Sequence, residues 1–152
     1  MITYLKGDAT DPQAKGAKII AHICNNMNGW GRGFVLAISK RWKEPEADYR
    51  NWYRNGPEFD LGKVRYVKVR DDIHIANMLG QQGMKTGSKG PPIRYEALRK
   101  CLIDVQKTAQ EYGATVHMPR IGTGLAGGKW EIIGPMIEEI FKDTVQVYVY
   151  DF

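Results

Sequence analysis

Residues 17–23 read AKIIAHI, an almost unbroken apolar run of strand length. A strand with one solvated face alternates apolar and polar side chains, whereas a continuous apolar run is typical of a strand covered on both faces. Helices supply this cover in layered α/β proteins. The run therefore predicts a central sheet with helices on each side, and strand and helix patterns do alternate along the chain.

The alternation extends over almost the whole sequence. The most regular helix is expected at residues 93–112, where apolar side chains recur every three or four residues before Gly113. In a helix expected at residues 130–142, the Gly134–Pro135 pair either delays the start or kinks the helix. The other expected elements are strands at 2–7, 17–23, 63–69, 71–79, 115–121 and 144–152 and helices at 34–42 and 46–55.

Composition narrows the class of protein. The 152 residues suit a single domain, which we expect to span residues 1–152. No apolar run reaches the ~18–20 residues of a membrane span. The first residues turn polar too early for a signal peptide, so we expect a cytoplasmic protein.

Cys24 and Cys101 are expected to be free buried thiols, a disulfide being the alternative. The histidines and cysteines lack metal-ligand spacing, so we expect neither a metal nor a cofactor.

Three glycine-bearing loops follow expected strands, at residues 6–8, 25–34 and 122–128. Ligands of α/β sheets bind at the carboxyl ends of strands, where such loops leave the sheet. Glycine lets backbone N–H groups approach a ligand, and successive N–H groups at a helix N-terminus bind phosphate. Glycine turns also occur there for structural reasons alone. Two such loops ahead of helices nevertheless favour a site for the two phosphates of a diphosphate, although G-x-x-x-x-G-K-[ST] is absent and GWGRGF at residues 29–34 does not match G-x-G-x-x-G.

Four segments resemble the macrodomain family, in the family's order: YLKGDAT, IIAHICNNMNGWGRGFVLAI, MPRIGTGLAGGKWEII and VYVY. The resemblance covers essentially the whole chain. It implies a three-layer α/β/α fold with a mixed central sheet, and ADP-ribose or ADP-ribosylated proteins as partners. Within the family the chain is most similar to the branch of protein-linked ADP-ribose glycohydrolases and ADP-ribose-1″-phosphate phosphatases.

The resemblance also implies a role for individual residues. Asp8 and the backbone N–H of Ala9 would bind the adenine and Tyr150 would pack beside it, unless Asp8 is an ordinary turn residue and Tyr150 a core residue. Asn25 would reach the distal ribose, with Asn26 as the alternative, unless it is a turn amide bonding its own backbone. Two walls would enclose the diphosphate and the distal ribose: Gly31, Arg32, Gly33 and Phe34 on one side, and Ile121, Gly122, Thr123, Gly124, Leu125 and Ala126 on the other.

The chain departs from the family at two catalytic positions. One type of glycohydrolase in this branch uses a lysine at the end of the central strand and an aspartate in the late glycine loop. Here Gln81 or Gln82 stands at the lysine position and Ala126 at the aspartate position. None of these side chains can act as a lysine nucleophile or a carboxylate base. Lys85 and Lys89 follow closely but are expected to be surface residues.

Three functions remain open on this basis. The first is slow hydrolysis of ADP-ribosyl esters on acidic side chains, with Asn25 and Gln81 positioning the attacking water and His22 as a weaker candidate. The second is removal of a 1″-phosphate in the same cleft. The third is binding of ADP-ribose without chemistry.

RNA binding is an alternative from a different class. It is suggested by the net charge of +5 and by four aromatic residues in one region, Trp42, Tyr49, Trp52 and Tyr53. These aromatic residues fall at helical spacing, however, and we expect them to pack a helix against the sheet.

Overall fold

The structure is a computed structural model that describes residues 1–83 and 90–152. Lys85 and Lys89 lie outside the described residues. All the expected strands and helices are present, with ends that differ by a few residues. The strands are β1 (Ile2–Lys6), β2 (Lys18–Asn25), β3 (Val64–Arg70), β4 (Ile73–Gln81), β5 (Thr115–Pro119) and β6 (Val147–Asp151), and the helices are α1 (Phe34–Arg41), α2 (Glu44–Asn55), α3 (Tyr95–Tyr112) and α4 (Trp130–Phe141).

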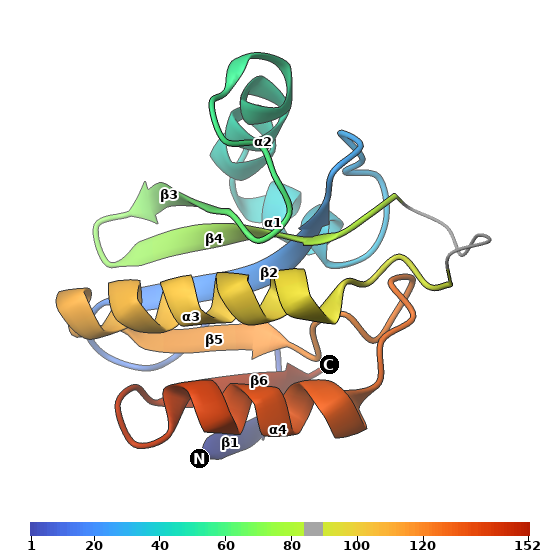
Figure 1. Cartoon of the computed structure of the whole chain (residues 1–152). Helices are drawn as coiled ribbons and strands as arrows, with labels where there is room; N and C mark the ends of the chain where they lie inside the picture. The colour runs from blue at the N-terminus through green and yellow to red at the C-terminus, as the bar shows by residue number, and fades with distance from the viewer. Residues whose placement is uncertain (84–89) are drawn as a thin grey trace.

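The strands form one mixed sheet in the order β1-β6-β5-β2-β4-β3 (Figure 1). Strand β3 is antiparallel to β4, and all other neighbouring strands are parallel. The register of β2 on β4 shifts between Cys24 and Asn25, so that Asn25 pairs with Gln81 at the carboxyl ends of both strands. The predicted mixed sheet is confirmed.

Helices cover the sheet on two sides, which confirms the three-layer arrangement. Helices α3 and α4 lie on one face, where Leu98, Leu102 and Ile137 are fully buried. Helices α1 and α2 cover β2, β4 and β3 on the other face, where Tyr49 and Trp52 are buried. These two aromatic side chains therefore pack the helix on the sheet and are not surface stacking platforms.

The burial of β2 on both faces explains its almost unbroken apolar run, from which the layered fold is predicted. Ile19 and Ala21 belong to the core beneath α3 and α4, whereas Ile20 and Cys24 belong to the core beneath α1 and α2. Cys24 and Cys101 are both buried and free, as expected.

Two helix ends follow the sequence signals differently. Helix α3 ends at Tyr112 and is capped by Gly113, whose φ of 63° is left-handed and suits glycine. Helix α4 begins at Trp130 and contains Pro135, so the Gly134–Pro135 pair does not delay its start.

None of the described helices is both long and apolar enough to span a membrane.

The connections leave a crevice between β2 and β5. The chain after β2 enters α1 and α2 on one face of the sheet, and the chain after β5 enters α4 on the other. Loops that diverge in this way from adjacent parallel strands open a ligand site at their carboxyl ends.

Candidate functional site

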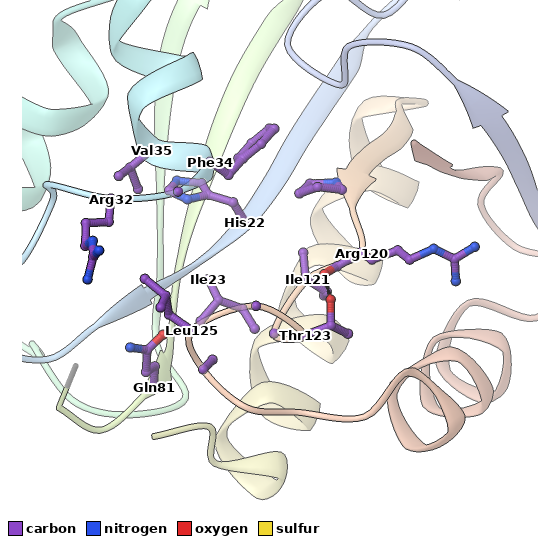
Figure 2. A pocket seen from close by; sticks show the side chains of 15 residues that line it. His22, Ile23, Arg32, Phe34, Val35, Gln81, Arg120, Ile121, Thr123 and Leu125 are labelled. Carbon is purple, nitrogen blue, oxygen red and sulfur yellow. Dashed lines mark hydrogen bonds between the residues drawn. The ribbon is translucent and has the colours of Figure 1, made fainter. Parts of the chain in front are cut away.

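A hollow of about 330 Å³ lies over this crevice (Figure 2). It is lined by the end of β2, the start of α1, Gln81 and the loop at 119–126. A second hollow of about 270 Å³ reaches Asn25 and Gly31 and shares Arg32, Gln81 and Leu125 with the first. We call the two together the cleft, and the second hollow its distal end.

The cleft collects most of the residues expected from the sequence. Gly31 and Asn25 line only the distal end. Ala9 is buried and does not line the cleft. The expected residues that line the first hollow are Arg32, Gly33, Phe34, Gln81, Ile121, Gly122, Thr123, Gly124, Leu125 and Ala126.

The glycine loop at residues 122–128 folds back on itself through its own backbone. The N–H of Gly128 donates to the carbonyl of Gly122 at 2.7 Å, and the N–H of Gly127 donates to that of Gly124 at 3.0 Å. The Thr123 hydroxyl donates to the Arg120 carbonyl at 2.8 Å. Within the part of the chain that the structure describes, the backbone N–H groups of residues 122–126 donate to no protein acceptor. They form a row of unsatisfied donors, as an anion site requires.

Gly122 and Gly124 differ in whether the surrounding protein leaves space for a side chain. Gly122 has a φ of 76°, and a Cβ there would lie 2.5 Å from Cδ1 of Ile93, so packing and backbone both demand glycine. A Cβ on Gly124 would meet no heavy atom within 4 Å. Gly124 is thus not required by the packing of the protein, and the space beside it is open for a ligand.

The start of α1 supplies a second row of donors. Gly33 precedes the helix with a φ of 81° and makes no side-chain cap. The N–H of Leu36 donates to Gly33 at 3.1 Å, but those of Phe34 and Val35 have no acceptor among the described residues. The positive end of the helix dipole is therefore open toward the hollow.

The side-chain charges of the cleft have one sign. Among the described residues that line it, Arg32 and Arg120 are cationic and none is acidic, but the Arg120 guanidinium points away from the cleft (Figure 2), so Arg32 is the cation that faces it. Arg120 is paired with Asp151, its Nε lying 2.6 Å from Oδ1. Arg32 is exposed and forms no salt bridge with any described residue. The cleft therefore suits an anion.

His22 places an unpaired nitrogen at the base of the first hollow. Its Nε2 lies 2.5 Å from Oδ1 of Asn77, whose amide nitrogen donates to the Pro45 carbonyl, so Nε2 carries the proton. Nδ1 is buried without a partner among the described residues. Burial lowers the pKa of His22 to about 4, although the Asn77 bond acts against it. Near neutral pH the ring is uncharged and Nδ1 is a free acceptor, which the position of His22 in an apolar strand did not reveal.

The Asn25 side chain is largely engaged in holding its own loop. Its Oδ1 accepts hydrogen bonds from the N–H groups of Met27 and Gly29 and from the Tyr49 hydroxyl, at 2.9, 3.0 and 2.9 Å. Its Nδ2 donates to the Gly29 carbonyl at 3.0 Å. Asn25 thus holds the 25–29 loop, while the second hydrogen of its Nδ2 has no acceptor among the described residues. Its expected role beside the distal ribose stays a prediction. Asn26 is also engaged, because its Oδ1 accepts from the N–H of Gly83.

Gln81, rather than Gln82, faces the cleft. The Nε2 of Gln81 donates to the Gly83 carbonyl at 2.9 Å, and its Oε1 has no donor among the described residues. Gln82 is exposed, and its oxygen accepts from Arg94. Gln81 thus presents to the cleft an amide oxygen that can accept a hydrogen bond but cannot attack carbon.

Asp8 and Tyr150 lie together in a third hollow of about 440 Å³, beside β6 and the loop after β1. Oδ1 of Asp8 accepts from the N–H and hydroxyl of Thr10, and Oδ2 accepts from Arg41 at 3.2 Å. Partial burial acts to raise the pKa of Asp8, but these hydrogen bonds hold it below its usual value. The carboxylate is ionised, and it orders its own turn as well as facing the hollow.

The remaining histidines have other surroundings. His117 lies under this third hollow, where its Nδ1 is 2.8 Å from the Tyr150 hydroxyl and burial lowers its pKa to about 4. His74 lies near Lys18 and Asp72, at the start of β2 and β4 and away from the cleft. Among the described residues, no group of His, Cys, Asp and Glu side chains could hold a metal ion.

These features define a class of protein: an α/β/α protein with a cationic, donor-lined cleft at the carboxyl ends of its parallel strands. No family model matches the chain. The human protein named ADP-ribose glycohydrolase OARD1 is 30% identical over 152 residues, covering 98% of this chain and 90% of that protein. An ADP-ribose 1″-phosphate phosphatase of Candida albicans is 24% identical over 98% of this chain and 99% of that protein.

Longer relatives and solved structures agree with this class. The chromodomain-helicase-DNA-binding protein 1-like of Danio rerio is 33% identical over 85% of this chain, which spans 13% of that protein. A structure from Bacteroides thetaiotaomicron is 52% identical and covers all of both chains with a TM-score of 0.97. A macrodomain protein from Streptomyces coelicolor is 48% identical, covering 100% of this chain and 99% of that chain with a TM-score of 0.90. The chain belongs to the macrodomain family.

Proposed function

We propose that the protein binds ADP-ribose in the cleft and slowly hydrolyses ADP-ribosyl esters on glutamate or aspartate side chains of proteins. The observation that carries this proposal is the row of unsatisfied N–H groups at residues 122–126, beside the open N-terminus of α1. Two rows of donors in a cationic cleft suit a diphosphate. Relatives named for acting on ADP-ribose and on its 1″-phosphate support the choice of ligand.

The ligand would span the carboxyl edge of the sheet. The adenine would occupy the hollow of Asp8 and Tyr150, and the diphosphate would lie between residues 122–126 and the start of α1. The distal ribose would then reach the distal end of the cleft, beside Gln81. Residues 1–152 would act as one macrodomain in the cytoplasm, where its two buried thiols stay reduced.

The chemistry would use water as the nucleophile. The water oxygen bonds to C1″ of the distal ribose, the bond from C1″ to the ester oxygen breaks, the carboxylate leaves, and the proton passes to solvent. Oε1 of Gln81, at the distal end, is an acceptor that can hold the water or a ribose hydroxyl. Since a carboxylate is a good leaving group, positioning supplies the catalysis.

A second candidate function is removal of a 1″-phosphate. Arg32 favours it, because this arginine lines both parts of the cleft and forms no ion pair with a described residue. An unpaired guanidinium at the distal end would bind a terminal phosphate.

The test offers the purified protein free ADP-ribose, ADP-ribose-1″-phosphate and a glutamate-linked ADP-ribosylated protein, and quantifies binding and products. We expect free ADP-ribose to be released from the ester without any adduct trapped by borohydride. Release of inorganic phosphate alone would favour the phosphatase. Tight binding without turnover would leave a binding module, and failure to bind ADP-ribose together with no turnover of either substrate would exclude all three functions.

A further inference from the structure

Arg120 precedes the glycine loop, and its side chain points away from the cleft (Figure 2). Its Nε and Nη2 donate to the two carboxylate oxygens of Asp151 at 2.6 and 3.1 Å. The guanidinium carbon lies 5.0 Å from the ring centre of Tyr4 and 5.2 Å from that of Trp130. Arg120 is thus held by a bidentate ion pair and two aromatic rings at once.

The two rings also contact each other. They are T-shaped, with centres 6.4 Å apart, and Nε1 of Trp130 donates to the Tyr4 hydroxyl at 3.0 Å. We call these four residues, Tyr4, Arg120, Trp130 and Asp151, the clasp. The clasp joins β1, the end of β5, the start of α4 and the end of β6.

The clasp brackets the glycine loop that lines the cleft. Arg120 lies before residues 122–128 and Trp130 follows them. The Arg120 carbonyl also accepts the Thr123 hydroxyl inside the loop. The N–H groups of residues 122–126 make no protein hydrogen bonds within the described structure, so their direction depends on the bonds that the loop's carbonyls accept, on its packing and on the segments at its two ends.

We propose that Arg120 is a positioning residue for the cleft: through the clasp it orients the backbone donors of residues 122–126 toward the diphosphate without touching the ligand. This inference rests on the proposed ADP-ribose binding. A loop that is ordered before binding does not lose that freedom when the ligand arrives, so the clasp contributes to affinity. The side chains of Arg120 and Asp151 are 38% and 43% exposed, so their pair contributes little to overall stability.

The chain offers a matched control for this arrangement. Arg65 makes the same kind of bidentate pair with Asp48, at 3.0 and 2.7 Å, and lies 5.8 Å from the ring centre of Trp52. This pair joins α2 to β3 and does not line the cleft. Arg65→Gln therefore removes an equivalent interaction elsewhere in the protein.

The experiment measures ADP-ribose and adenosine affinities by calorimetry for the wild type, Arg120→Gln, Arg120→Lys, Asp151→Asn and Arg65→Gln. We expect Arg120→Gln and Asp151→Asn to weaken ADP-ribose binding about ten-fold and to leave adenosine binding unchanged. Arg65→Gln should change neither affinity. Arg120→Lys should recover only part of the loss, because a lysine keeps the charge but cannot form the bidentate, stacked contact.

Several outcomes would overturn the inference. Unchanged ADP-ribose affinity in Arg120→Gln would do so, and so would equal weakening of both ligands or full recovery by lysine. NMR order parameters of residues 122–126 test the clasp without any ligand, and we expect them to fall in Arg120→Gln but not in Arg65→Gln. If the wild type fails to bind ADP-ribose, the proposed function fails, and unchanged order parameters would separately reject the clasp.

Discussion

Gly124 is the position where a single side chain tests the cleft most directly. Its backbone is not left-handed, and no heavy atom lies within 4 Å of a Cβ built there. We therefore expect Gly124→Glu to fold normally and to abolish ADP-ribose binding, because the new carboxylate fills the ligand's space and repels its phosphates. Calorimetry measures this result, and Gly124→Gln, equal in size but uncharged, should weaken binding less.

Gly122, in the same loop, contrasts with Gly124 because its position is restricted by packing and by its backbone conformation. A Cβ there would press on Ile93 at 2.5 Å from a backbone with positive φ, so Gly122→Ala should lower the unfolding free energy by about 1–3 kcal/mol. If Gly124→Glu bound ADP-ribose as tightly as the wild type, the diphosphate would not lie along this loop.

His22 makes stability depend on pH. Burial lowers its pKa from 6.5 to about 4, so between these values the unfolded chain binds a proton that the folded chain excludes. The unfolding free energy should therefore fall as the pH falls through this window, by roughly 3 kcal/mol in all. Urea titrations at pH 7.5 and pH 5 should show about 2 kcal/mol of this change, because pH 5 lies part of the way through the window. His117 contributes in the same direction, so His22→Gln should flatten the pH dependence in part. An unaltered dependence in that variant would show that His22 does not titrate in this way.

At the scale of elements, the loop after β2 is held by one buried amide. The Asn25 side chain makes hydrogen bonds to four partner groups, three through its oxygen and one through its nitrogen. Asn25→Ala leaves several of them unpaired and should lower the unfolding free energy by about 1–3 kcal/mol, measured by urea denaturation. Asn51, which accepts one exposed bond from Asn55, provides the control, and Asn51→Ala should be nearly neutral. Equal stability of both variants would mean that the Asn25 bonds do not hold the loop.

The strands and helices could be predicted because each depends on its own pattern of residues. The run of β2 alternates between two cores, and Gly113 marks the end of α3. The partners of the site residues could not be predicted in this way. Asn25 is held by Tyr49 from α2, and Asp8 by Arg41 from α1. These contacts join segments that are distant in sequence, so no local pattern of residues predicts them.

The whole molecule brings distant parts of the chain to one edge of the sheet. The cleft uses residues from β2, α1, β4 and the loop after β5, and the third hollow uses β1, β5 and β6. A ligand that spans both hollows would contact both halves of the sheet. Its binding energy should then stabilise the fold as a unit, because it binds only when all these segments are in place.

Thermal unfolding measures this coupling. At a concentration of about 100 Kd, ADP-ribose should add about 2.7 kcal/mol to the unfolding free energy, which corresponds to a rise in Tm of about 5–10 °C for a chain of this size. We expect adenosine to fill only the hollow of Asp8 and Tyr150 and to bind more weakly, so it should raise the Tm less at the same concentration. Gly124→Glu should keep the adenosine shift and lose the ADP-ribose shift. Loss of both shifts in that variant would mean that the two hollows are not separate parts of one site, since a change confined to the glycine loop would then have disabled the adenine end as well.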